Sequence, residues 1–561
     1  MKQIRIGIES FEKIIDGGYF YVDKTLFIKE LLENMGEVTL ITRPRRFGKT
    51  LNMNMLKCFF DIRSPSPAPS SNDRIRRLFK GLKIMEHGGI VEEHMGKHPV
   101  VFLTLREVEE PSYDGSIEVI RRLVSELYER NLYIYESGKL GERQKSVFYS
   151  LYMGSATDTQ LKSALQFLTS CLHAYYGKRA VVLVDEYDAP INTAYLKGYY
   201  PEMIEFMRGF MGSVFKSNPF LEFGVLTGIL RISKEGMMSS FNNPFVRGVM
   251  DKEFAECFGF TEDEVKDACR AYGLADNYDV VKKWYNGYRF GGRDMYNPWS
   301  ITSYLIDKEI GPYWVNTAST ELFADVFHKG DDSLRESLAG LITGATVDMS
   351  LRDEITYPID YSNSDALWTL LLYAGYIKPC NGAKKSRFAA ELVNLEISEL
   401  FADRAKEWLG KMQPTISKAI QGFAGCLLRG DEEGVRRALN DDLLNNPSCY
   451  DYKEENSYHM FIFGMLLALS EGYTVHSNPE SGKGRSDCLI MPVEKNEPAV
   501  VIEFKHRCED GADLRAAAEE GLRQIEEKAY VHSLKQEGYA KIYKYSIAFH
   551  KKNCEIAMGI E

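Results

Sequence analysis

The strongest chemical signal lies near the end of the chain. Asp487 ends a glycine-containing turn, and the apolar run that follows carries Glu503 and Lys505. Because alternate residues of a β-strand point to one face, Glu503 and Lys505 project together while Phe504 turns into the core. Two carboxylates can hold a divalent cation, and a nearby ammonium can orient or deprotonate a water. The pattern therefore predicts metal-dependent hydrolysis of phosphodiester bonds.

Further groups are expected to complete this centre. The main-chain carbonyl of Phe504 is a natural third oxygen ligand, and Gln524, on the helix expected next, could position a water or a phosphate. Two candidates for another acidic residue remain open, namely Glu455 before a helical segment and Glu480 in a turn. Tyr530 either stacks on a base or packs in the core, and the core is favoured.

The charge balance limits how nucleic acid could be bound. The chain has 69 Lys and Arg against 80 Asp and Glu, a net charge of -11, so it lacks a global basic signature. Any contact with phosphates must use a local patch. Four side chains near the acidic residues would supply one: Arg485, His506, Arg507 and Arg523. A zinc site at His506 is not indicated, because no Cys or second His stands at ligand spacing.

A second signal lies near the N-terminus, where residues 42–50 read TRPRRFGKT after an apolar strand. Main-chain N–H groups of such a loop cradle phosphates, while Lys49 reaches the β- and γ-phosphates and the Thr50 hydroxyl binds Mg²⁺. The predicted phosphate-binding loop comprises Arg45, Arg46, Phe47, Gly48, Lys49 and Thr50. Its two arginines either contact phosphates or form ion pairs within the loop. Arg43 stands where the general pattern has its first glycine.

An apolar strand at residues 180–184 ends in two acidic residues and is expected to complete the nucleotide site. Asp185 would hold Mg²⁺ through water, and Glu186 would polarise the attacking water. Asp188 is either a further acidic contact or a turn residue.

A third strand end carries Thr227 and, four residues later, Arg231. Thr227 could sense the γ-phosphate from the end of its strand. Arg231 either stabilises the charge that develops during hydrolysis, as an arginine finger does, or lies in a surface turn.

The order of elements predicts how these sites are carried. Apolar strands at 38–42, 99–105, 180–184 and 223–227 alternate with helical segments, which favours an α/β fold with a parallel sheet. Aromatic clusters at 284–288 and 296–300 more often fill a core than form a base-stacking platform. A chain of 561 residues suggests several domains. We expect a P-loop domain at 1–245, a helical or winged-helix-like domain at 246–400, and a mixed α/β domain at 401–561 that begins with a helical connector.

Composition also suggests a location. The ten cysteines are scattered without a CxxC pair, which is typical of reduced thiols. The longest apolar run, at about 460–469, is shorter than the roughly 20 residues that cross a bilayer. Residues 1–13 show no signal pattern. We therefore expect a cytoplasmic protein without a membrane partner.

Several of these strings resemble one family. The segment Tyr21-Val22-Asp23-Lys24-Thr25, the strings RPRRFGKT and VDEYDAP, and the WYNGY and YNPWS clusters resemble the AAA-ATPase-like family often found in gut bacteria. The arginine at the first glycine position belongs to that family's own pattern. The C-terminal part is similar to the PD-(D/E)XK nuclease family, whose late motif Gln524 matches. The resemblance implies a P-loop ATPase of the additional-strand type joined to a restriction-endonuclease-like domain, with ATP and Mg²⁺ as cofactors and Mn²⁺ as an alternative at the nuclease site.

Two hypotheses follow. The first is an ATP-regulated, metal-dependent nuclease that cuts DNA or RNA, in defence against foreign nucleic acid. The second is a nucleotide-dependent switch or assembly module, including a homo-oligomer, that binds nucleic acid or a protein partner without cutting. The sequence leaves the type of nucleic acid, the cleavage specificity and the activating signal open.

Overall fold

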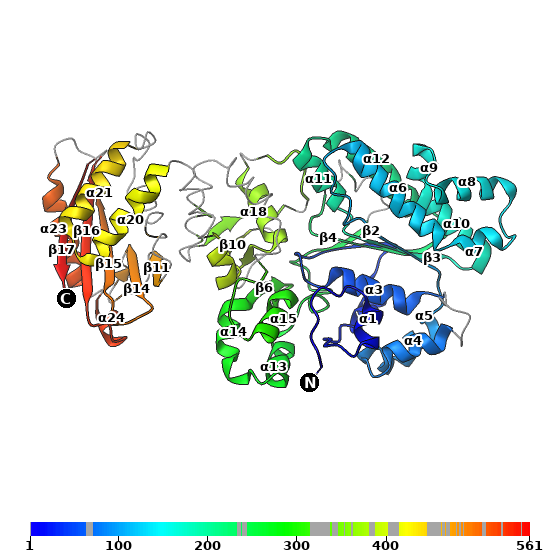
Figure 1. Ribbon diagram of the computed structural model, residues 1–561, viewed down its shortest axis with the longest axis horizontal. Coiled ribbons are helices and arrows are strands. Elements are labelled where there is room, and N and C mark those ends of the chain that lie inside the picture. Colours follow the sequence, from blue (N-terminus) through cyan, green and yellow to red (C-terminus); the bar gives the residue numbers. More distant parts are fainter. Residues whose placement is uncertain are drawn as a thin grey trace. The chain divides into compact units, whose positions relative to one another are not determined.

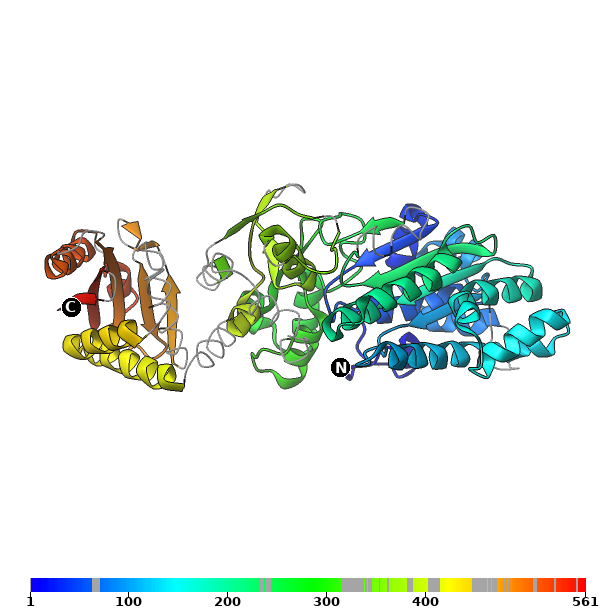
Figure 2. The same cartoon turned by 90° about the horizontal axis from the view of Figure 1, so that it is seen from above.

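The computed structural model describes residues 2–62, 71–232, 237, 244–314, 337–338, 341, 346–352, 354–360, 363–380, 387–401, 414–445, 462, 466, 472–477, 480–481, 484–485, 487–507, 512–528, 531–550 and 553–561. The chain divides into two compact units (Figures 1 and 2). The first unit holds residues 1–329 and 348–396, and the second holds 330–347 and 397–561. The division after residue 396 lies close to the expected boundary at 400, while the expected boundary at 245 falls inside the first unit and stays a prediction.

A parallel sheet of order β2-β3-β4-β1-β5 forms the centre of the first unit. Its strands are β1 Val38–Thr42, β2 Val100–Thr104, β3 Ala180–Asp185, β4 Leu221–Gly228 and β5 Phe245–Arg247. Strands β1 and β3 are buried along their whole length, as expected for a parallel sheet covered on both faces. Strand β4 lies between β1 and β3, which is the additional-strand arrangement that the resemblance implied.

Helices cover both faces of this sheet (Figure 1). One group contains α1 Phe11–Asp16, α3 Lys49–Phe60, α4 Ser71–Phe79 and α5 Gly88–His94. The other contains α6 Tyr113–Glu129, α7 Leu132–Glu136, α8 Glu142–Tyr152, α9 Asp158–Lys162, α10 Ala164–Tyr176, α11 Ala189–Lys197 and α12 Tyr200–Phe215. Helix α2, Leu26–Asn34, precedes β1. Because β4 pairs in parallel with both β1 and β3, the carboxyl ends of these three strands lie side by side.

The rest of the first unit combines helices with short strands. Its helices are α13 Glu262–Ala271, α14 Tyr278–Tyr285, α15 Pro298–Asp307 and α18 Ser364–Ala374. Its strands are β6 Asn286–Phe290, β7 Arg293–Tyr296, β8 Val347–Met349, β9 Ile377–Pro379 and β10 Phe388–Leu392. Helix α15 begins where the Asn297 side chain accepts the N–H of Trp299 at 2.8 Å, with Pro298 at the first helical position. Tyr285 and Tyr288 are buried, in line with the favoured interpretation of their cluster.

The second unit contains a mixed sheet of order β11-β14-β15-β16-β17, in which only β15 and β16 are parallel. The strands are β11 Tyr473–Ser477, β14 Cys488–Pro492, β15 Ala499–His506, β16 Ile542–His550 and β17 Asn553–Ile560, with a hairpin of β12 Glu480–Ser481 and β13 Gly484–Arg485. Its helices are α20 Pro414–Arg429, α21 Glu432–Asn445, α23 Leu514–Glu527 and α24 His532–Gln536.

The expected helical connector is part of this unit's core. Phe423 and Leu427 of α20 and Val435 of α21 belong to one buried cluster with Ile502 and Phe504 of β15. Helix α23 packs on the opposite face, so the yellow pair α20–α21 and the orange helix α23 lie on different sides of the strands in Figure 2. Residues 414–429 and 432–445 of the predicted connector are helical, and the described apolar side chains of α20 and α21 cover the sheet.

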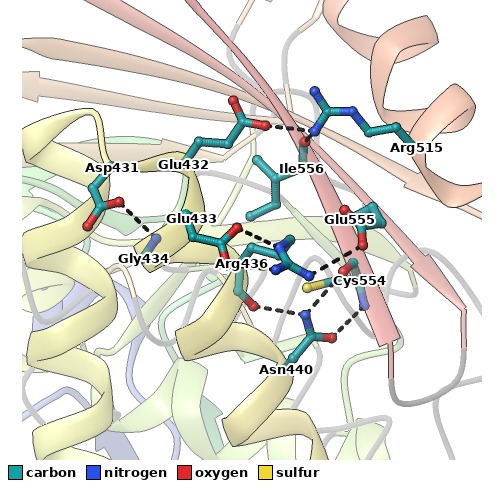
Figure 3. A network of polar contacts seen from close by, with 10 residues as sticks. All are labelled: Asp431, Glu432, Glu433, Gly434, Arg436, Asn440, Arg515, Cys554, Glu555 and Ile556. Atoms are coloured by element: carbon teal, nitrogen blue, oxygen red, sulfur yellow. Dashed lines mark hydrogen bonds and ion pairs between the residues drawn. The ribbon is translucent and has the colours of Figure 1, made fainter.

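Helix α21 also protects the edge of the sheet (Figure 3). Asn440 donates to the carbonyl of Cys554 at 3.2 Å and accepts the N–H of Cys554 at 2.9 Å. Arg515 of α23 donates to the carbonyl of Ile556 and pairs with Glu432 at 2.7 Å. These contacts occupy outward main-chain groups of β17, which would otherwise be a template for pairing with another chain.

Among the helices within the described ranges, none is long and apolar enough to cross a membrane.

Candidate functional site

The phosphate-binding loop joins β1 to the N-terminus of α3. Gly48 has a left-handed φ of 81°, which a residue without Cβ adopts readily. Lys49 is only 4% exposed, and its Nζ donates to the carbonyls of Arg43 at 3.2 Å and Pro44 at 3.0 Å. Burial lowers the pKa of Lys49, and the nearby acidic residues oppose that shift. The loop therefore holds a desolvated cation at a helix N-terminus, where anions bind well.

Arg43, the second residue of the 42–50 segment, is held by hydrogen bonds to main-chain carbonyls. Its guanidinium is fully buried and donates to the main-chain carbonyls of residues 42, 247, 248, 253 and 254. It also lies over the rings of Phe258 and Phe290, with its Cζ 5.5 and 5.1 Å from their centroids. Burial lowers its pKa to about 10. Arg43 thus binds the loop to a distant segment, a role that the sequence pattern did not reveal.

Asp185 is brought together with residues from two other elements, as predicted. Its Oδ2 accepts the hydroxyl of Thr50 at 2.7 Å, and its Oδ1 accepts the hydroxyl of Thr227 at 2.6 Å. The register explains this, since Ile41 pairs with Thr227 and β4 also pairs with β3. Burial raises the pKa of Asp185, and the two hydroxyls oppose the shift. These three side chains form the arrangement expected for a Mg²⁺ site beside phosphates.

A cavity of about 400 Å³ opens beside the loop. Its wall includes Lys49, Thr50 and Glu186, together with residues 5–9 of the N-terminal segment. Arg46 and Glu186, which both line it, have left-handed φ values of 65° and 51°. Non-glycine residues in this strained conformation cluster at functional sites, although Ser217, Phe254 and Lys308 also adopt it here. The cavity has room for a nucleotide-sized ligand.

Side chains of the two aromatic clusters pack against the phosphate-binding loop. The Cζ of Arg46 lies 4.3 Å from the ring centroid of Trp299, which also lines the cavity. Phe47 is buried against Tyr288, with centroids 4.7 Å apart. The carbonyl of Arg45 accepts from Trp314 Nε1 at 3.1 Å. Arg46 and the main chain of Arg45 are thus fixed by aromatic side chains.

Asp188 and Arg231 lie apart from the cavity lining. Asp188 is 2% exposed and accepts the N–H groups of Ile229 at 2.9 Å and Leu230 at 2.8 Å. It therefore fixes the turn that follows β4. Arg231 pairs with Glu354 at 3.0 Å.

In the second unit, neighbouring strands bring the predicted acidic residues together. Cys488 pairs with Ile502 in antiparallel register, so Asp487 and Glu503 are the next cross-strand neighbours. Asp487 accepts the N–H of Phe504 at 2.6 Å. Glu503 Oε1 accepts from Lys505 Nζ at 3.0 Å and from the Gln524 amide, whose oxygen in turn accepts from Lys505 at 2.9 Å. These four side chains, Asp487, Glu503, Lys505 and Gln524, form the acidic centre.

One carboxylate oxygen of the acidic centre has no partner among the described residues. Glu503 is 3% exposed, and its buried Oε2 makes no hydrogen bond within the part of the chain that the structure describes. Burial raises the pKa of Glu503 to about 7, and the Asp487 carboxylate adds to the shift. Burial raises the pKa of Asp487 as well. Two such carboxylates favour a bound cation, because it would compensate their buried negative charge.

Close packing of α23 places Gln524 in the acidic centre. A Cβ on Gly521 would lie 2.2 Å from Ser546 Oγ and 3.2 Å from Lys505 Cγ. Only glycine therefore allows the helix to approach β15 and β16 so closely. Sequence patterns around Gln524 did not reveal this requirement.

Other predicted members of the acidic centre can be placed only in part. Glu455 and Tyr530 lie outside the described residues, as do the side chains of Glu480 and Arg485. Arg507 pairs with Glu520 at 2.5 Å, whereas Arg523 is exposed on α23. No group of three or more His, Cys, Asp or Glu side chains within the described ranges is placed to hold a metal. A cation here would therefore have two carboxylates, with main-chain and water oxygens as its other ligands.

Comparison with known proteins identifies the families that two parts of the chain match. Residues 5–238 match the AAA-ATPase-like family, described as predicted AAA-ATPase, and residues 453–558 match the PD-(D/E)XK nuclease superfamily. A curated relative, an uncharacterized protein in the vnfD 5′ region of Azotobacter chroococcum mcd 1, is 29% identical over 554 residues. The match covers 96% of this chain and 94% of the relative, whose name states no activity.

Proposed function

Because the chain joins an AAA-ATPase-like domain to a domain of the PD-(D/E)XK nuclease superfamily, we propose that it is an ATP-hydrolysing, metal-dependent nuclease. The observation that carries the nuclease proposal is the buried Glu503, hydrogen-bonded to Lys505 and Gln524 on one oxygen and unpartnered on the other. A carboxylate in this setting suits a cation, with an ammonium held beside it.

In the first unit, the proposed roles follow from the contacts around the cavity. Lys49 would exchange its carbonyl partners for phosphate oxygens, which satisfy its charge better. Thr50 and Asp185 would hold Mg²⁺, and Thr227 would orient Asp185. Glu186, at the cavity wall, would accept a proton from the attacking water.

In the second unit, Asp487, Glu503 and the carbonyl of Phe504 would hold Mg²⁺ or Mn²⁺. The bound cation would stabilise charge on the scissile phosphate and lower the pKa of a coordinated water. Lys505 orients that water, and Gln524 keeps Lys505 and Glu503 in place through its two hydrogen bonds. The exposed Arg523, next to Gln524 on α23, would contact the backbone of DNA or RNA.

The proposal is tested by measuring cleavage and ATP hydrolysis on the same preparations. Labelled single- and double-stranded DNA and RNA are incubated with Mg²⁺ or Mn²⁺, with and without ATP. The full-length protein is compared with Asp487→Asn and Lys49→Ala. We expect Asp487→Asn to lose cleavage by at least about 100-fold while it hydrolyses ATP normally, because only the acidic centre is changed. We expect Lys49→Ala to lose ATP hydrolysis and the effect of ATP on cleavage.

A matched control removes a carboxylate outside the acidic centre. Glu519→Gln on α23 changes an exposed residue that pairs with Arg515 at 3.4 Å, and both activities should be unchanged. Cleavage that survives in Asp487→Asn would point to a contaminating nuclease and overturn the assignment. ATP hydrolysis without cleavage of any substrate would favour a nucleotide-dependent switch that binds without cutting.

A further inference from the structure

A cationic side chain at the nucleotide cavity has no role in the assignment above. Arg106 lies two residues beyond the end of β2 and lines the cavity together with Lys49, Thr50 and Glu186. The sequence pattern pointed to Arg231 as the candidate arginine instead. Arg231 is absent from the cavity lining and pairs with Glu354.

The sheet fixes where Arg106 lies. Strand β2 pairs with β3 on the side away from β4 and β1, and Thr104 pairs with Asp185. The N–H of Leu105 donates to the carbonyl of Asp185 at 3.0 Å, so the register continues past the strand end. Arg106 therefore stands on the far side of the acidic pair Asp185–Glu186 from the phosphate-binding loop. Because Glu186 is the proposed base for the attacking water, the γ-phosphate would lie beside this acidic pair, and Arg106 lines the same cavity.

The charges around Arg106 suit such a role. Its guanidinium donates to Glu9, which also lines the cavity, so the side chain is held against the wall. Burial lowers its pKa, but the ion pair with Glu9 and the nearby Glu186 and Asp185 outweigh that effect and raise it overall. An arginine keeps its charge in this setting and offers a planar fork to phosphate oxygens.

We propose that Arg106 is a catalytic residue that contacts the terminal phosphate of the bound nucleoside triphosphate from the β2 side. The inference rests on the proposed ATP hydrolysis and names the cation that this reaction uses. The water oxygen bonds to the γ-phosphorus as the bond from that phosphorus to the β,γ-bridging oxygen breaks. The electron pair stays on ADP, and a proton of the water passes to Glu186. Arg106 neutralises the charge on the non-bridging oxygens while this happens.

The test separates binding from hydrolysis in the full-length protein. ATP turnover is measured at saturating Mg²⁺-ATP, and the affinities for ADP and for a slowly hydrolysed ATP analogue are measured by fluorescent-nucleotide displacement. Arg106→Ala should lower turnover by about 100-fold or more. It should weaken binding of the ATP analogue by about tenfold and leave ADP affinity within about threefold, because only the triphosphate reaches Arg106. Arg106→Gln is a second variant that keeps a polar group but removes the guanidinium and its charge, and it should show the same losses.

Arg122→Ala is the matched control. Arg122 is an exposed arginine outside the cavity lining, paired with Glu107 at 2.6 Å and Glu126 at 2.7 Å, and its loss should leave turnover and both affinities unchanged. Arg231→Ala is the competing candidate. Turnover of Arg106→Ala within threefold of the parent, or a large loss confined to Arg231→Ala, would overturn the inference and leave the proposed ATPase intact.

Two further outcomes are decisive. If the parent binds both nucleotides without turnover, the ratio of the two affinities is the readout, and an unchanged ratio in Arg106→Ala overturns the inference. If the parent binds neither nucleotide, the proposed nucleotide function fails and the inference fails with it. That outcome is distinguishable, because it appears in the parent protein before any substitution.

Discussion

The phosphate-binding loop of the first unit and the acidic centre of the second unit both bury charge, but they satisfy it in different ways. Lys49 donates to two carbonyls of its own loop, and both oxygens of Asp185 accept threonine hydroxyls. Glu503 shares one oxygen with Lys505 and Gln524 and leaves the other buried without a partner. The loop is therefore compensated by groups of the chain, whereas at the acidic centre we propose that a cation from outside the chain supplies the missing partner.

The two sites also differ in how far apart in the sequence their hydrogen-bonded residues lie. Arg43 reaches carbonyls as far as 211 residues away in the chain. The contacts of the acidic centre span 21 residues or fewer, from Asp487 to Phe504 and from Glu503 to Gln524. The nucleotide site thus depends on distant segments of the first unit, and the acidic centre depends on β14, β15 and a helix that packs on β15 and β16.

The largest expected effect tests this long-range support. Arg43→Gly restores the glycine of the general loop pattern, yet we expect it to destabilise the first unit by about 3–5 kcal/mol, because five main-chain carbonyls lose a charged donor. Thermal unfolding should show a melting temperature lower by at least about 5 °C, with loss of nucleotide binding. Cleavage by the acidic centre should persist below that temperature.

Arg43→Lys is the matched control, because it keeps the positive charge but loses the planar guanidinium with its several donors. It should recover only a small part of the stability, because one ammonium cannot reach carbonyls on both sides of the guanidinium. If Arg43→Gly melts like the parent and binds nucleotide, Arg43 is dispensable and the nucleotide site does not depend on distant segments.

This contrast explains what the sequence could and could not predict. The placement of Glu503 and Lys505 on one face, with Phe504 in the core, follows from the two-residue period of a strand, and the structure confirms it. The meeting of Thr50 with Asp185 follows from the motif order and the parallel sheet, and is also confirmed.

The missed features depend on long-range packing. The partners of Arg43 are main-chain carbonyls, which carry no residue-type signature. Arg106 follows a strand whose position beside β3 is set by the fold and by no local pattern. The packing of α20 and α21 on the second sheet was missed for the same reason, since an amphipathic helix does not reveal what it covers.

An intermediate effect is expected at the acidic centre, where support is local. Gly521→Ala would place a methyl group 2.2 Å from Ser546 Oγ, 3.1 Å from Ser546 Cβ and 3.2 Å from Lys505 Cγ. We expect α23 to shift in response and carry Gln524 away from Glu503. We expect a loss of about 1–3 kcal/mol in stability and about tenfold in cleavage, with ATP hydrolysis unchanged. Ser546→Ala removes the closest atom, so the double variant should recover most of both losses.

Gly422→Ala provides the control for a glycine-to-alanine change in a helix. A Cβ at this position of α20 meets nothing within 4 Å, so the change should be neutral or slightly stabilising. Equal effects at Gly422 and Gly521, or no recovery in the double variant, would show that close packing of α23 does not position Gln524.

The smallest expected effect concerns the buried carboxylate of Glu503. The pKa of Glu503 is raised from 4.5 to about 7, so between these values the folded protein keeps a proton that the unfolded chain releases. Its contribution to stability is therefore lost as pH rises through this window and stays lost above about pH 7. Glu503→Gln should match the parent near pH 4 and exceed its unfolding free energy by about 1–3 kcal/mol at pH 8 in EDTA.

Saturating Mg²⁺ provides the complementary condition for the same pair of proteins. A cation at the acidic centre stabilises the parent and has one carboxylate fewer to bind in Glu503→Gln, so the advantage of the variant at pH 8 should shrink or reverse. A stability difference that is independent of pH in EDTA would mean that Lys505 and Gln524 already compensate Glu503. The acidic centre would then resemble the phosphate-binding loop, in which groups of the chain itself compensate the buried Lys49 and Asp185.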